Sequence, residues 1–429
     1  MNYREWRMAI EGARVEAHFQ PIFSSETGLL FGHEALGRLV GADGRAETLG
    51  PFFSSHAPIR SSSAERSRHE VFKRDVDRMI RFDAMERAAA DVSAGFLFLN
   101  IAPSLILDHL ERSDTALPYT ILAARESGLD PNRVVLELTE EEIRTDPERL
   151  NSVIDLYRAE GFRIALDDVG SASSNLDRVA LFKPDIIKID FLLLKRSAGG
   201  STSSEGYRRV IESLASLSSR LGADLLFEGI ENADDFQNAL SFGGRYLQGF
   251  LFARAGREFE ESRARFELIS RHRELYCFQR HGSALRRKRE ERLLVDSVSA
   301  SGIDQAFAAV SAEADLAASL ARKANAPGLE KLARAYTTDR AGIQLSSNYD
   351  FSRTGGFAVV STDGGARGKC WCLRPYFFDH VEKDMNAPGS WTVSEPYRDI
   401  AFGRQMKTVA RSVSDELVVF LDFFHEEES

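Results

Sequence analysis

The sequence predicts an α/β protein made of a (β/α) barrel, a helical connector and a small α+β domain. Five short runs rich in β-branched, Leu or Phe residues have the composition of buried strands: 95–101, 133–140, 162–168, 185–190 and 224–231. Stretches with one apolar helical face lie between these runs, and this alternation is typical of βα units. The units recur often enough for a barrel, which alone takes about 250 residues.

Two of the intervening helices show their ends in the sequence. Asp146 and Pro147 are typical of a helix start, and Gly161 is typical of the stop that follows. Residues 207–221 carry a second one-faced helical pattern, which ends at Gly222.

The pattern changes after about residue 255. Residues 258–335 are mostly helical in character. From Tyr336 onward the signals are those of strands and turns: the segment 343–347, the glycine pairs 355–356 and 364–365, and the apolar closing run 417–424. We therefore expect a barrel over residues 1–256, a connector over 257–334 and a C-terminal domain over 335–429.

Polar residues at or just beyond the strand ends indicate a functional rim. In a (β/α) barrel the functional residues lie at the C-terminal ends of the strands. The residues in question are Glu34, Asn100, Glu137, Asp167, Asp168, Lys188, Glu228 and Gln248.

The oxygen-rich composition of this rim favours a hard divalent cation such as Mg²⁺ or Mn²⁺ over zinc. Two neighbouring residues of a strand point to opposite sides, so Asp167 and Asp168 can face one metal only where the strand opens into a loop. Two ions could then share a carboxylate and hold a water in line with a phosphodiester. Composition alone leaves open a set of solvated rim carboxylates.

Eight ordered motifs resemble the EAL-domain family of cyclic di-GMP phosphodiesterases over roughly residues 1–256. They are Gln20-Pro21-Ile22, Glu34-Ala35-Leu36-Gly37-Arg38, Asn100, Glu137-Leu138-Thr139-Glu140, Asp167-Asp168-Val169-Gly170, Lys188-Ile189-Asp190, Glu228-Gly229-Ile230-Glu231 and Gln248-Gly249-Phe250. The resemblance implies a TIM-like (β/α)8 barrel that hydrolyses cyclic di-GMP to linear pGpG with two Mg²⁺ or Mn²⁺ ions.

The resemblance also implies residue roles. The metal ligands would be Glu34, Asn100, Glu137, Asp167, Asp168 and Glu228. Lys188 would orient the attacking water, with Asp168 and Glu228 also catalytic, and Glu140 would anchor the loop after Asp168. The substrate-binding residues would be Gln20, Pro21, Leu36, Arg38 and Gln248.

Two departures from the family pattern leave a second function open. Gly37 stands where the family usually has Leu, and the loop after the paired aspartates reads Val169-Gly170-Ser171-Ala172-Ser173 in place of Phe-Gly-Thr-Gly-Tyr. Because this loop couples dimer contacts to the second metal in the family, the alternative is a noncatalytic receptor of cyclic di-GMP.

The C-terminal part resembles a PAS-like, Cache-type sensor fold, as in YkuI-type EAL proteins, through the motifs around Tyr336, Gly342, Arg374 and Ser394. A small, amino-acid-like ligand could be held by Arg374, Tyr376, Tyr397 and Asp422. The alternative is that the aromatic residues belong to the core and that Arg374 pairs with a carboxylate.

Charge and composition restrict the partners and the compartment. A net charge of −10 argues against polymeric nucleic acid, and no apolar run is long enough for a membrane span or signal peptide, so we expect a cytoplasmic protein and, from the family, a homodimer. We interpret the basic run 286–292 as a solvated helix face. Cys370 and Cys372 are too close in sequence for a zinc knuckle, and we expect them on one face of a strand.

Overall fold

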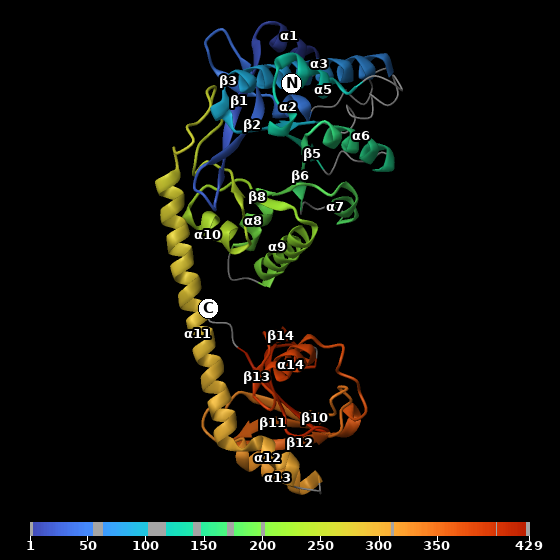
Figure 1. The fold of residues 1–429 in the computed structure, drawn as a ribbon, viewed down its shortest axis with the longest axis vertical. Helices are drawn as coiled ribbons and strands as arrows, with labels where there is room; N and C mark the ends of the chain where they lie inside the picture. The colour runs from blue at the N-terminus through green and yellow to red at the C-terminus, as the bar shows by residue number, and fades with distance from the viewer. Residues whose placement is uncertain are drawn as a thin grey trace. The chain divides into compact units, whose positions relative to one another are not determined.

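The computed structural model describes residues 3–54, 63–101, 117–139, 147–169, 176–198, 202–309, 313–399 and 401–425. It divides into two compact units, Met1–Phe278 and Gln279–Ser429. Each unit is built around its own β-sheet, as Figure 1 shows.

The first unit is a closed barrel with helices outside it. Its strands are β1 (Arg14–Ser24), β2 (Leu30–Val40), β3 (Ala46–Thr48), β4 (Phe96–Asn100), β5 (Val134–Thr139), β6 (Arg163–Val169), β7 (Ile186–Ile189), β8 (Asp224–Phe227) and β9 (Tyr246–Leu247). Strands β2 and β4 to β9 run parallel to one another, and pairing of β1 with both β2 and β9 closes the ring. The expected (β/α)8 barrel is confirmed.

The direction of the first strand was not foreseen. β1 runs antiparallel to β2 and to β9, so β1 and β2 form a hairpin in which Gln20 lies opposite Glu34. β3 pairs with β2 outside the ring.

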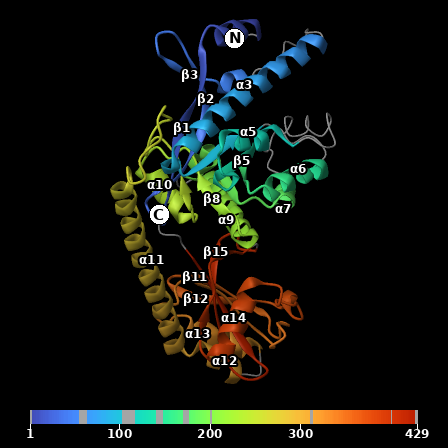
Figure 2. The ribbon, with the colours of Figure 1, turned by 45° about the horizontal axis from the view of Figure 1, so that its top comes forward.

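The helices of the first unit cover the outer face of the barrel. They are α1 (Tyr3–Glu11), α2 (Gly50–Phe53), α3 (Ser63–Ala90), α5 (Tyr119–Ser127), α6 (Pro147–Ala159), α7 (Leu176–Phe182), α8 (Phe191–Ser197), α9 (Thr202–Leu221) and α10 (Ala233–Ser241). The long helix α3 packs on β1 and β2, as the second view shows (Figure 2). The main apolar core lies between these helices and the strands.

Both predicted helix patterns form helices, α6 and α9. The stop at Gly161 is confirmed by its positive φ of 101°, a backbone conformation that favours glycine. Asp146, the expected N-cap, lies outside the described residues.

The second unit is a seven-stranded antiparallel sheet with helices on both faces. The strands are β10 (Leu332–Thr338), β11 (Asn348–Thr354), β12 (Phe357–Asp363), β13 (Thr392–Val393), β14 (Tyr397–Arg398), β15 (Gln405–Ser412) and β16 (Val418–Phe424). Along β16, Val419, Leu421 and Phe423 face one apolar cluster, and Val418 and Phe420 face another.

Different helices cover these two faces. Residues of α12 (Ile303–Ala309) and α13 (Glu313–Lys323) belong to the first cluster, and α14 (Pro375–Asn386) contributes Tyr376 and Phe377 to the second. α11 (Phe266–Ser301) begins in the first unit and ends in the second.

Three expectations for the C-terminal part can be compared with this structure. The closing run forms β16, but the predicted strand 343–347 is wrong, because Ile343 and Gln344 make only isolated bridges, to Cys370 and Thr338. The expectation that Cys370 and Cys372 share one face of a strand is also wrong. Cys370 makes only an isolated bridge, and Cys372 lies in a turn.

In the basic run, Arg286 to Glu290 are exposed on α11. Within the described residues, no helix is long and apolar enough to cross a membrane.

Candidate active site

The inward-facing residues of the barrel form two successive layers. The lower layer, which we call the apolar plug, consists of Ile22, Phe98, Val135, Ala165, Ile186, Leu226 and Tyr246. In each parallel strand that contributes to the plug, the next inward-facing position lies two residues after the plug residue. At that position, within the strand or just beyond its end, stands a polar side chain. These side chains are Asn100, Glu137, Asp167, Lys188, Glu228 and Gln248.

The hairpin strands complete the polar layer. Gln20 lies two residues before Ile22 on β1, which runs in the opposite direction, and it is paired with Glu34 of β2. The layer therefore combines residues from all eight strands of the ring or from the positions just beyond their ends, and it rests on the apolar plug.

A local irregularity brings both neighbouring aspartates into this layer. The register between β6 and β7 shifts between Leu166 and Val169, and Asp168 has a positive φ of 56°. This shift turns Asp168 out of the strand alternation, and carboxylate oxygens of Asp167, Asp168 and Glu228 lie within 4.8 Å of one another. The opening that the adjacent pair requires is thus a β-bulge.

Lys188 is the centre of the charged cluster. Its side chain is only 1% exposed, and its Nζ lies 2.7 Å from Glu137, 2.5 Å from Glu228 and 3.1 Å from Asp167. The carboxylate of Glu34 is 3.9 Å away. One ammonium therefore contacts carboxylates from four different strands or strand ends.

Burial and these contacts shift the pKa values in opposite directions. Burial opposes the charged form of Lys188, but the carboxylates, led by Asp167 and Glu137, hold its pKa well above the usual value. Burial raises the pKa of Glu137 well above its ordinary value, and it raises that of Glu228 to about 8 although Lys188 counteracts it. The cluster thus carries more carboxylates than one lysine can neutralise.

Glu34 is fixed by hydrogen bonds from two sides. Its Oε1 accepts from Asn100 Nδ2 at 2.9 Å, and its Oε2 accepts from Gln248 Nε2 at 2.7 Å. Burial alone would raise the pKa of Glu34, but Lys188 and these bonds outweigh it and lower the pKa. Glu34 is therefore held as a carboxylate.

The residues fit a divalent cation. Two buried oxygen atoms accept no hydrogen bond from the described part of the chain. They are Oε2 of the Glu137 carboxylate and Oε1 of the Gln248 amide. Unpaired buried oxygens of this kind are costly unless a cation or an ordered water meets them. Together with Asp167, Asp168 and Glu228, they form the oxygen donor set that Mg²⁺ and Mn²⁺ prefer.

A cleft of about 530 Å³ opens on this cluster. Glu34, Asn100, Asp167 and Asp168 line one part of it, and Leu36 and Arg38 continue the wall along β2. Its volume lies in the range typical of small-molecule sites. Arg38 is half-buried there and donates to the Gly37 carbonyl at 3.0 Å.

Helix α3 forms a wall that sequence reasoning missed. Glu70, Lys73, Arg74, Asp77, Ile80 and Arg81 line the same cleft. Most of these residues are charged, so the sequence alone indicates a solvent-exposed helix. The packing of α3 on the barrel is what turns one side of the helix toward the site. Ile80 also accounts for Gly37, because a Cβ at Gly37 would lie 2.5 Å from Ile80 Cδ1.

Strand alternation turns one expected substrate residue, Pro21, away from the barrel interior. Pro21 is buried on β1 between Phe19 and Phe23, whose side chains face the outer core, so strand alternation turns it away from the interior. This corrects its assignment as a substrate contact. Gln20 faces the interior, where its Nε2 donates to the Ala253 carbonyl at 3.4 Å, and Glu140 lies outside the described residues.

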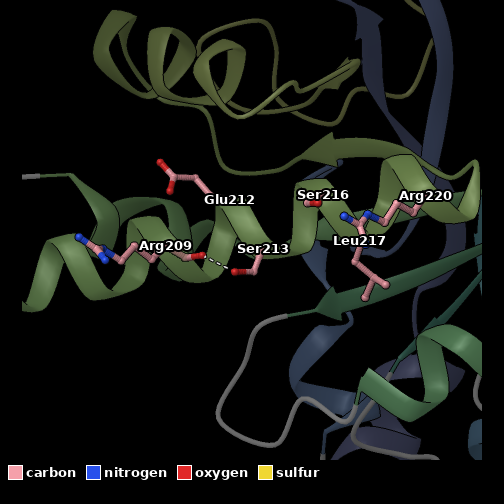
Figure 3. Close-up of a pocket in the computed structure, with 6 residues that line it drawn as sticks. All are labelled: Arg209, Glu212, Ser213, Ser216, Leu217 and Arg220. Carbon is pink, nitrogen blue, oxygen red and sulfur yellow. Dashed lines mark hydrogen bonds between the residues drawn. The ribbon is translucent and has the colours of Figure 1, made fainter. Parts of the chain in front are cut away.

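A separate hollow of about 580 Å³ does not have the features of a site. Figure 3 shows that its lining side chains are spread along α9 and do not converge on one point. They are Arg209, Glu212, Ser213, Ser216, Leu217 and Arg220.

In the second unit, three of the four residues expected to line a ligand pocket lie together. The Tyr376 and Tyr397 rings stack with centroids 4.9 Å apart, and Asp422 accepts hydrogen bonds from Thr408 at 2.7 Å and Tyr397 at 3.4 Å. Burial raises the pKa of Asp422 to about 6.

Arg374 does not join this buried cluster in the way expected. It is exposed and lies over the Trp371 ring, 5.9 Å from the centroid. The guanidinium that lowers the pKa of Asp422 belongs to Arg334, which pairs with Asp350 at 2.7 Å. Arg334 was missed because nothing in the sequence distinguishes it from other strand arginines.

The fold is that of a known family. Residues 3–255 match the EAL domain, and residues 286–427 match the EAL-domain associated signalling protein domain. The chain belongs to the EAL-domain family of cyclic di-GMP phosphodiesterases.

Among its relatives, YkuI of Bacillus subtilis (strain 168), an uncharacterized EAL-domain containing protein, is 30% identical over 424 residues, which cover 94% of this chain and 93% of YkuI. The crystal structure of YkuI in complex with its substrate cyclic di-GMP and calcium matches with a TM-score of 0.83 at 27% identity, over 100% of both chains.

Over the barrel alone, the probable cyclic di-GMP phosphodiesterase PdeB of Escherichia coli (strain K12) is 26% identical over 253 residues, which cover 58% of this chain and 44% of PdeB.

Proposed function

We propose that this protein hydrolyses cyclic di-GMP to linear pGpG with two Mg²⁺ or Mn²⁺ ions. The observation that carries the proposal is the convergence of Glu34, Glu137, Asp167 and Glu228 on the buried Lys188 at the edge of the cleft, with Asp168 beside Asp167 and Glu228. The binding of cyclic di-GMP and calcium by YkuI, and the activity named for PdeB, support it.

The two ions would have distinct ligands. Glu34, Asn100, Glu137 and Asp167 would hold one ion, and Asp167, Asp168 and Glu228 would hold the other. When bound, such ions polarise the phosphate and make water a better nucleophile. The surplus of carboxylates over ammonium groups at the site is the electrostatic reason to expect two dications.

The protein's own groups would position the reactants. The Lys188 ammonium would orient the attacking water, and Gln248 Oε1 would accept a hydrogen bond from a water of the same shell. The water oxygen forms a bond to phosphorus, and the bond from phosphorus to the 3′ oxygen breaks. The products are a 5′ phosphate and a 3′ hydroxyl.

Further residues would hold the ligand and the loop. Arg38, which has donors left after its bond to Gly37, would grip phosphate oxygens in pairs, and Leu36 and Gln20 would contact guanine. Glu140 would anchor the loop after Asp168. The C-terminal domain would modulate the activity, with a small-molecule ligand near Tyr376, Tyr397 and Asp422.

The proposal is tested by product analysis. Purified protein is incubated with cyclic di-GMP and Mg²⁺ or Mn²⁺, and pGpG is measured by chromatography. We expect pGpG with either metal and none with a chelator. Glu34→Gln should reduce turnover at least about 100-fold because it removes a ligand charge, whereas Glu231→Gln, an exposed position near Glu228 that pairs with Lys195, should not. Absence of product with both metals would refute hydrolysis.

The altered loop Val169-Gly170-Ser171-Ala172-Ser173 favours a second candidate, a cyclic di-GMP receptor without turnover. Calorimetric titration with cyclic di-GMP separates the two. Binding without product identifies a receptor, and absence of both binding and product excludes both functions.

A further inference from the structure

The second unit contains a pair of cysteines whose sulfur atoms are in contact. Cys370 Sγ and Cys372 Sγ lie 2.9 Å apart. Residues two apart in an extended strand have Cα atoms more than about 6 Å apart, with side chains standing roughly parallel. Here the chain enters a turn at Cys372, and this turn directs the two thiols toward each other.

The backbone around the pair is fixed from one side by the loop 342–344. Cys370 makes an isolated β-bridge with Ile343, and Trp371 N donates to the Gly342 carbonyl at 2.8 Å. The indole N–H of Trp371 donates to Gln344 Oε1 at 2.7 Å. These contacts hold Trp371, the residue between the cysteines, by both its backbone and its side chain. The backbone that brings the two thiols together is therefore fixed by the fold.

The pair is open to a small reagent on one side and packed on the other. Cys370 is exposed, and Cys372 is partly buried against an aromatic cluster that includes Tyr336, Tyr376 and Phe420. An exposed thiol with a second thiol in contact is the arrangement in which an attacking and a resolving cysteine work together.

We propose that Cys370 and Cys372 form a dithiol that a low-molecular-weight disulfide, such as glutathione disulfide, oxidises to an intramolecular disulfide. This chemistry is separate from the barrel site and does not rest on the function proposed above.

The exchange has two balanced steps. The Cys370 thiolate attacks one sulfur of the oxidant, forms a mixed disulfide and releases one thiolate. Cys372 then loses its proton, and its sulfur attacks Cys370 Sγ and expels the second thiolate. Two protein thiols become one disulfide, and one molecule of oxidant becomes two molecules of thiol. The hydrogen bond with Cys370 raises the pKa of Cys372, which fits the role of the protonated, resolving thiol.

Trp371 should report the reaction. Its ring packs near Tyr336, with centroids 6.0 Å apart, and its backbone joins the two cysteines directly. Closing the ring of a Cys-Trp-Cys disulfide must change the backbone torsions of Trp371, so its fluorescence should change on oxidation and recover on reduction.

The experiment uses the full chain with Cys277→Ser, which removes the exposed cysteine of α11 and leaves the pair. The protein is incubated with glutathione disulfide, alkylated and digested with trypsin. Both cysteines fall in one peptide, residues 370–383, because Pro375 protects the bond after Arg374. We expect this peptide to lose two hydrogen atoms and to take up no alkyl group.

Single-cysteine variants are the matched controls. Cys370→Ser and Cys372→Ser should each stop at a stable mixed disulfide with glutathione, and neither should lose two hydrogens. If either single variant does not fold, the peptide map of the Cys277→Ser protein, which keeps both cysteines, still tests the proposal. Three results would each overturn the proposal. They are glutathione retained on both cysteines, two free thiols under conditions that modify Cys277 in the wild type, and a disulfide between two chains.

Discussion

Replacement of Lys188 with Met should destabilise the metal-free barrel strongly. The ammonium lies within 3.1 Å of Glu137, Glu228 and Asp167, and removing it leaves buried carboxylates without their counter-ion. Breaking a buried ion pair from one side costs about 3 to 5 kcal/mol. We expect a loss in this range in the free energy of unfolding, measured in the presence of a chelator so that no cation replaces the ammonium.

The barrel transition can be observed separately from that of the second unit. The chain has three tryptophans, and Trp6, in the first unit, is 5% exposed and packs against Phe52. In a background with Trp371→Phe and Trp391→Phe, Trp6 fluorescence during urea unfolding reports the barrel alone. The loss is read from the urea midpoint and slope.

Two further variants make this prediction specific. Lys195→Met removes a lysine that also contacts two carboxylates but is 31% exposed, and it should cost about 1 kcal/mol or less. Asp167→Asn in the Lys188→Met protein should recover at least about 1 kcal/mol, because it removes one buried carboxylate that has lost its counter-ion. A loss below about 1 kcal/mol for Lys188→Met, or additive losses in the double variant, would refute the electrostatic account.

The remaining predictions use the same Trp6 assay. His33 donates from Nδ1 to the Ala94 carbonyl and accepts from the Glu260 N–H at Nε2, and burial lowers its pKa to about 4 from an unfolded value of 6.5. The unfolded state therefore binds more protons between these values, so stability should fall by up to about 3 kcal/mol as the pH decreases from 6.5 to 4, and His33→Gln should flatten this dependence. Asp190→Ala removes the cap that accepts from Leu192 N and Leu193 N at the start of α8 and should cost about 1 kcal/mol; no change would show that the cap is dispensable. Gly37→Leu should cost roughly 1 to 3 kcal/mol through its clash with Ile80, and Ile80→Ala in the same protein should recover part of the loss, whereas an unchanged midpoint for Gly37→Leu would contradict the packing.

The sequence predicted the barrel and its polar rim because both follow from alternation within single strands. Asn100, Glu137 and Lys188 each stand two residues after an apolar inward residue, so the position of each is a local property of its strand. The adjacent Asp167 and Asp168 even required a local opening of the strand, which the β-bulge provides.

The features that the sequence did not predict depend on contacts between distant segments. The antiparallel direction of β1 is set by its hairpin with β2 and its closure on β9, and alternation alone cannot show it. The role of α3 in the cleft depends on which side of a charged helix packs inward. The strand expected at 343–347 is replaced by isolated bridges because its partners, Thr338 and Cys370, lie on two different segments.

The apolar plug gives the barrel a single mouth. Seven side chains from seven strands fill the interior beneath the polar layer, so among the described residues the approach to Lys188 is from the side where the strands end. Reactant and product must therefore share one path. Any segment that covers this path, whatever its origin, would control entry and release together without touching a metal ligand.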